Sequence, residues 1–119
     1  MEATNSNVTD LTYLKELAKG DNAFIKEMLV VFMEQTPEAI GNLEKYYGDK
    51  NWKMLRAVAH KMKPSFTFVG LKELTPVINL IEEYAEKEIH FDLLPEMISK
   101  VKTFCNKAMV ELEEQKKSF

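Results

Sequence analysis

Apolar residues recur along this chain at intervals of three and four, the period of an α-helix that buries one side. The clearest run lies between Asn51 and Gly70, where four apolar residues share one helical face: Leu55, Ala59, Met62 and Phe66. The same pattern predicts long helices over residues 22–47, 71–85 and 94–112, and a short one over residues 11–19. The chain is therefore expected to be all-α.

Turn-forming residues separate these segments. Gly20, Gly48 and Gly70 each follow a predicted helix, a position at which glycine commonly ends one. Helices of this length joined by short connections pack side by side in antiparallel fashion. We therefore predict an antiparallel four-helix bundle with a short extra N-terminal helix, formed by residues 9–115 after a disordered polar tail, residues 1–8.

Some details of these helices stay open at this point. The short first helix carries three leucines that we expect to be buried: Leu11, Leu14 and Leu17. Pro37 interrupts the second helix, which therefore either kinks or restarts with Thr36 as its cap. We expect residues 89–92 to form a loop, and the polar chain from Glu113 onward to fray.

Composition narrows the functional classes. Sixteen basic against nineteen acidic side chains give a net charge of -3, which argues against a nucleic-acid partner. A single cysteine, Cys105, excludes an internal disulfide and a cysteine-based zinc site. The sequence has no apolar run of bilayer length and no signal peptide at its start. We expect a cytoplasmic protein with no metal site and no membrane partner.

The candidate chemistry centres on His60, which lies about 120° from the middle of the buried face of its helix. Arg56 and Lys63 stand at i−4 and i+3, so both neighbour the imidazole. Such cations favour the neutral ring, whose free lone pair makes it a nucleophile, and they become partners for phosphoryl oxygens afterwards. Metal binding would require a second ligand nearby. The surroundings therefore favour phosphate chemistry.

Residues 59–71 read AHKMKPSFTFVGL. This segment resembles the signature of histidine-containing phosphotransfer domains, in which alanine precedes a phosphorylated histidine and a lysine and a final glycine follow. His60 matches the phosphoacceptor, Lys63 the lysine and Gly70 the glycine. Weaker similarity extends over roughly residues 10–112.

Pro64 departs from that signature, which usually has glycine at this position. Proline lacks the N–H that would pair with the carbonyl of His60, and its ring crowds that carbonyl. We predict a local distortion of the helix at His60 or a carbonyl left free to bind water. Ser65, the next residue, falls in the run of small residues that the signature contains.

The resemblance implies a phosphorelay in which His60 accepts a phosphoryl group from a receiver-domain aspartate and passes it to another. Lys63, helped by Arg56, would neutralise the phosphoryl oxygens. The second ring nitrogen needs an acceptor that fixes its tautomer. Three residues are candidates for that acceptor: Gln35, Glu82 and Glu83.

The same resemblance names the partners as response-regulator receiver domains and a hybrid sensor histidine kinase. Mg²⁺ is expected in the receiver and no cofactor in this chain, which has no glycine-rich phosphate loop for ATP. A monomer without autonomous kinase activity is implied. Met28 or Phe68 could form an apolar docking patch.

Other readings of the same residues stay open. A relative that only docks a receiver domain, without phosphotransfer, is the main alternative. The dimerisation helix of a sensor kinase and a stand-alone enzyme with His60 as general base are less well supported. His90 and Cys105 are read as structural residues.

Overall fold

The computed structural model describes residues 7–119, and the predicted all-α bundle is confirmed there. The elements are α1 (Thr12–Ala18), α2 (Asn22–Gly48), α3 (Trp52–Val69), α4 (Thr75–Lys87), the single 3₁₀ turn η1 (Phe91–Leu93) and α5 (Leu94–Lys116). Most of the predicted disordered tail lies outside the described residues. The predicted loop at residues 89–92 contains η1, and α5 runs three residues beyond Glu113.

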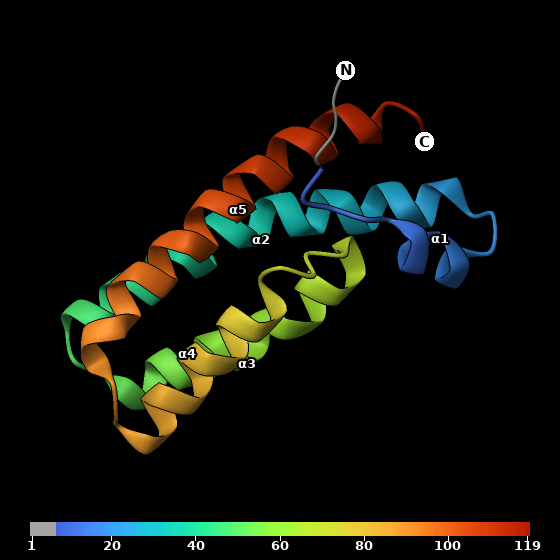
Figure 1. Cartoon of the computed structure of the whole chain (residues 1–119). Helices are drawn as coiled ribbons and strands as arrows, with labels where there is room; N and C mark the ends of the chain where they lie inside the picture. Colours follow the sequence, from blue (N-terminus) through green and yellow to red (C-terminus); the bar gives the residue numbers. More distant parts are fainter. Residues whose placement is uncertain (1–6) are drawn as a thin grey trace.

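The four long helices form two layers, as Figure 1 shows. One layer pairs α2 with α5 and the other pairs α3 with α4, while short α1 covers the ends of α2 and α3. Apolar side chains between the layers are fully buried, among them Leu29, Leu43, Leu55, Ile81 and Leu112. The apolar faces predicted from the sequence thus meet in one core.

Side-chain caps fix where two of the long helices, α2 and α3, begin. The carboxylate of Asp21 accepts a hydrogen bond from the backbone N–H of Phe24 at 3.0 Å. Asn51 does the same for Met54 at 3.2 Å. Each cap satisfies an N–H that has no partner within its helix. The two caps therefore mark the first turns of α2 and α3.

Two details of the prediction need correction. Leu17 is not buried: 46 % of it is exposed, and Ala18 takes the inward position instead. The three leucines recur every three residues, so their row drifts about 60° around the helix at each step and Leu17 ends about 120° from Leu11. The restart of the second helix at Thr36 is also wrong, because α2 is one continuous helix with Pro37 inside it.

A polar clamp closes one end of the bundle, formed by Val8, Thr9, Glu111 and Gln115. The carboxylate of Glu111 accepts hydrogen bonds from the backbone N–H groups of Val8 and Thr9, at 2.8 and 3.1 Å. It also accepts one from the Thr9 hydroxyl at 2.6 Å, and Gln115 donates to the same hydroxyl. The clamp ties the segment before α1 to α5, about a hundred residues away.

Asp10, the residue after Thr9, is bound to the end of α3. The backbone N–H of Asp10 donates to the carbonyl of Val69 at 2.9 Å, beside Gly70. Gly70 has φ 69°, and a Cβ there would lie 2.1 Å from the Asp10 carbonyl oxygen. Only glycine fits this position, which explains why α3 ends there.

Helix length and polarity also bear on membranes. Across residues 7–119, none of the helices combines the length and the apolar run that crossing a bilayer requires.

Candidate functional site

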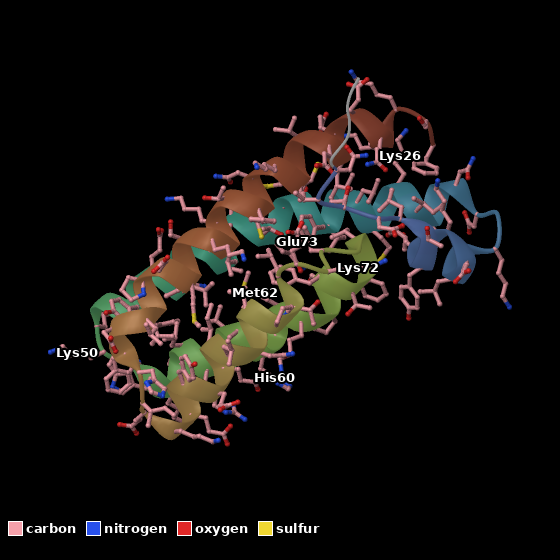
Figure 2. The ribbon with its side chains drawn as sticks, viewed as in Figure 1. Lys26, Lys50, His60, Met62, Lys72 and Glu73 are labelled. Atoms are coloured by element: carbon pink, nitrogen blue, oxygen red, sulfur yellow. The ribbon has the colours of Figure 1, made fainter. Side chains whose placement is uncertain are left out.

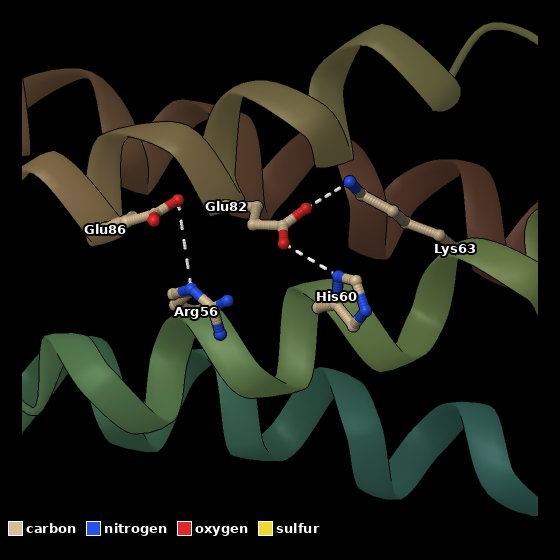
Figure 3. Close-up of polar contacts among 5 residues, drawn as sticks. All are labelled: Arg56, His60, Lys63, Glu82 and Glu86. Atoms are coloured by element: carbon tan, nitrogen blue, oxygen red, sulfur yellow. Dashed lines mark hydrogen bonds and ion pairs between the residues drawn. The ribbon is translucent and has the colours of Figure 1, made fainter.

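The candidate site lies on the α3–α4 pair and follows from a matched spacing. Arg56 and His60 are four residues apart on α3, and Glu82 and Glu86 are four apart on α4. Residues four apart lie on the same side of a helix. Since the two helices run antiparallel, His60 meets Glu82 and Arg56 meets Glu86 (Figure 3).

His60 projects outward from the bundle, whereas Met62, two residues later, points inward (Figure 2). Its side chain is 65 % exposed, as the helical wheel predicted. The Nδ1 atom lies 2.8 Å from a carboxylate oxygen of Glu82, within hydrogen-bond distance. Figure 3 shows the other ring nitrogen, Nε2, turned away from that carboxylate.

Glu82 is the least exposed group at this site, since only 12 % of its side chain is accessible. Its second carboxylate oxygen pairs with the ammonium group of Lys63. Hydrogen bonding from Lys63, and then from His60, holds the pKa of Glu82 below its usual value, although partial burial opposes this effect. Glu82 is therefore an anion at neutral pH.

The charge of Glu82 determines where the imidazole carries its proton. An ionised carboxylate can only accept hydrogen bonds, so Nδ1 is the donor in this contact. In the neutral ring the lone pair then resides on Nε2, the nitrogen that faces away from the protein. The geometry thus presents a nucleophilic nitrogen to solvent in a fixed orientation.

The two predicted cations flank this histidine, but both already have carboxylate partners. Lys63 contacts Glu82, and the guanidinium Nε of Arg56 lies 3.9 Å from Glu86. The basic flank expected from α3 alone is therefore balanced by an acidic row on α4. Sequence reasoning missed Glu86, although its i, i+4 spacing from Glu82 matches that of Arg56 and His60 and could have revealed it.

The structure selects among the three candidate acceptors for the histidine. Glu82 makes the contact. Glu83 points elsewhere, and its carboxylate pairs with Lys87 at 3.4 Å. Gln35 lies on the far side of α3 from α4, in a groove of about 310 Å³ between α2 and α3.

Residues of the signature segment also line this α2–α3 groove. Ser65 and Lys61 line it, together with the exposed apolar side chain of Met54. Lys61 directly follows His60 but points about 100° further around α3, and His60 itself is not among the residues that line the groove. Met28 and Phe68, the residues suggested for a docking patch, are both half-buried.

Pro64, which departs from the signature, lies inside α3, whereas the signature glycine Gly70 lies at its end. Pro64 is exposed, and α3 continues through it without interruption, so the predicted distortion at His60 stays a prediction. Gly70 ends α3 in a left-handed conformation, as expected from the sequence. Within residues 7–119, no group of three His, Cys, Asp or Glu side chains is arranged to hold a metal ion.

Comparison with known protein families shows to which family the chain belongs. A family model described as Hpt domain matches residues 27–115 of the chain, which include all of α3, α4 and η1. The chain belongs to the Hpt domain family. This match confirms the resemblance that the segment around His60 indicated.

Individual relatives agree with the family. The chain is 29 % identical over 91 residues to the phosphorelay intermediate protein YPD1 of Candida albicans. That similarity covers 74 % of this chain but only 49 % of the relative, so the chain spans about half of its length. Among solved structures, histidine-containing phosphotransfer protein B (HptB) of Pseudomonas aeruginosa PAO1 superposes with a TM-score of 0.82, covering 97 % of this chain and 99 % of that one. The two chains are 17 % identical, so the similarity to HptB supports the fold alone.

Proposed function

We propose that this chain is a phosphorelay intermediate that carries a phosphoryl group on His60 between receiver domains. One observation carries the proposal: the 2.8 Å contact between Nδ1 of His60 and the carboxylate of Glu82. This contact leaves Nε2 exposed with its lone pair, which is what a nucleophile requires. Membership of the Hpt domain family supports the same chemistry.

The transfer step exchanges one bond to phosphorus for another. The lone pair on Nε2 attacks the phosphorus of a phosphoaspartate, the N–P bond forms, and the bond from phosphorus to the aspartate oxygen breaks. The aspartate leaves as a carboxylate, and the proton on Nδ1 stays where it is. The ring then carries a positive charge beside the anionic Glu82, which stabilises it. The second receiver's aspartate reverses the step.

Lys63 is placed to assist once the phosphoryl group arrives. Its ammonium contacts Glu82 before transfer, one helical turn from His60. Oxygens of a phosphoryl group on Nε2 would compete with Glu82 for that ammonium, which acts as a compact point charge. Arg56, more exposed and weakly paired, is the second cation within reach of a bound partner. Mg²⁺ in the receiver would supply the remaining charge neutralisation.

Docking of the receiver is assigned to the surface around His60. The α2–α3 groove, about 100° around α3 from His60, offers the exposed side chain of Met54 and the polar side chain of Gln35. We further propose that the protein is a cytoplasmic monomer. Size-exclusion chromatography with light scattering measures its molar mass and so tests the monomer. A hybrid sensor kinase that carries a receiver domain is one source of the phosphoryl group.

The experiment follows label from a phosphorylated receiver domain, with Mg²⁺, onto the full chain. A panel of receivers charged with acetyl phosphate serves as donors. We expect an acid-labile, base-stable adduct on the wild type and on His90→Gln, and none on His60→Gln. His90→Gln is the matched control because His90 is the second histidine and is also exposed. Receivers that bind without transferring label would instead support the docking-only alternative.

A further inference from the structure

A second surface of the molecule lies away from His60, between α4 and α5. It is a groove of about 570 Å³ that runs along α5. Apolar side chains line it from both helices: Val77, Leu93, Met97 and Phe104. Leu93 is 41 % exposed, so part of this apolar surface meets solvent.

Basic side chains gather at the Phe104 end of the groove, whose lining contains Lys100 and one acidic residue, Glu96. Residues 99–110 of α5 include three lysines and no acidic residue, although the chain has a net charge of -3. Lys102 is paired with Glu44 on α2. Among the described residues, Lys100 and Lys107 form no ion pair, and their ammonium groups lie 5.6 and 5.7 Å from the ring centre of Phe104.

The two lysines and Phe104 together form a basic, apolar strip. A cation over an aromatic face is attracted to it, and the lysine stems cover apolar surface beside the ring. Such a strip suits a partner helix with apolar residues on one side and acidic residues next to them. Charge complementarity therefore identifies the kind of partner.

The shape of the surface favours a helix over a membrane. The strip lies in a concave groove between two helices, which a flat bilayer surface does not enter. Glu96, at the η1 end of the groove, would be repelled by anionic lipid headgroups. From Leu93 to Lys107 the groove and the strip together extend about 21 Å, the length of about four helical turns.

We propose that this α4–α5 groove is a second docking site, which takes an acidic amphipathic helix of a partner protein. Glu96 at one end would pair with a basic residue of that helix and so set its direction. Val77 lies about 140° around α4 from Glu82, so the groove and the His60 site face different ways. Both sites can then be occupied together.

The test uses a synthetic peptide of about 14 residues, with leucines on one helical face and flanking glutamates. Titrated into ¹⁵N-labelled protein, it should shift backbone resonances of α4 and α5 that line the groove. Lys100→Glu combined with Lys107→Glu should weaken binding on the order of tenfold, since the reversal turns two attractive charge pairs into repulsive ones. Lys26→Glu with Lys53→Glu is the matched control, because both lysines are exposed on other helices.

Several outcomes would overturn the proposal. These are absence of binding at millimolar peptide, affinity that the charge reversal leaves unchanged, and equal affinity for a peptide with lysines in place of the glutamates. Binding to phosphatidylserine vesicles instead of the peptide would assign the strip to a membrane. A dimer that the charge reversal dissociates would assign it to a second copy of the chain. Circular dichroism checks that each variant is folded, and none of these readouts depends on phosphotransfer.

Discussion

Two glutamates of this protein each hold several hydrogen-bond donors, yet they serve different ends. Glu111 accepts from two backbone N–H groups and the hydroxyl of Thr9, and so fixes the chain before α1 against α5. Glu82 accepts from the side chains of His60 and Lys63 at the surface. Donors from the backbone lock the fold, whereas donors from mobile side chains can be exchanged for another ligand.

This difference makes separable predictions. Changes at the polar clamp should lower stability and leave transfer by folded molecules intact. Changes at Glu82 should mainly slow transfer, because the side chains that pair with it, His60 and Lys63, are partly exposed and such ion pairs contribute little to stability.

The largest effect is expected for Gly70→Ala, beside the clamp. An alanine Cβ would lie 2.1 Å from the backbone oxygen of Asp10, and the residue would keep a positive φ. We expect a loss of about 2–3 kcal/mol in the free energy of unfolding, from strain at this position. Urea denaturation measures it. The control is Gly41→Ala, where a Cβ meets no atom within 4 Å, and an equal loss there would contradict the account.

Glu82→Gln should come next, and on transfer. The amide can donate to Nδ1 as well as accept from it, so the ring no longer has one preferred tautomer. We expect transfer to His60 to slow by about 10- to 100-fold, the usual range for loss of an orienting group. The free energy of unfolding should change by less than about 0.5 kcal/mol.

Glu83→Gln is the matched control for Glu82→Gln, because Glu83 adjoins Glu82 on α4 but pairs with Lys87. Single-turnover transfer from a charged receiver measures the rate of each variant. Equal rates for both variants and the wild type would show that Glu82 does not position His60.

Glu111→Gln should have a smaller effect, and on stability. The substituted amide presents an NH₂ group to at least one of the donors at Val8 and Thr9, which then loses its acceptor. A loss of about 1 kcal/mol is expected for one such hydrogen bond. Glu114→Gln, on the exposed side of α5, is the control, and transfer by folded protein should match the wild type.

The smallest effect concerns acid stability at Asp10. Hydrogen bonds from the hydroxyl and N–H of Thr12, and then from Lys72, lower the pKa of Asp10 to about 2 from 3.8. A lowered pKa in the folded state stabilises the fold above pH 3.8, and that contribution disappears as the pH falls toward about 2. Asp10→Asn should flatten the fall of stability with pH in this window. An unchanged profile in urea unfolding would contradict this assignment.

Local patterns were enough to predict most of the fold. The apolar period placed the four long helices, since this signal acts within a few residues. Leu17 was misjudged because leucines that recur every three residues drift around a helix of about 3.6 residues per turn, which carries the third leucine off the buried side. The effect of Pro37 on the second helix was left open. Proline removes one backbone hydrogen bond, but tertiary packing decides whether the helix continues past it.

The site was predictable in part. His60, Lys63 and Arg56 follow from one helix, but the choice of Glu82 over Gln35 and Glu83 depends on the register between α3 and α4. The clamp from Thr9 to Glu111 and the α4–α5 groove were not foreseen, because they join segments far apart in sequence with no periodic signal between them.

The most direct test of the central claim is to locate the phosphoryl group on the ring of His60. Two-dimensional ¹H–¹⁵N and ³¹P NMR of the phosphorylated protein distinguishes the two ring nitrogens. The account predicts a phosphoryl group on Nε2, with Nδ1 still protonated and bound to Glu82. A phosphoryl group on Nδ1, or on any residue other than His60, would contradict it.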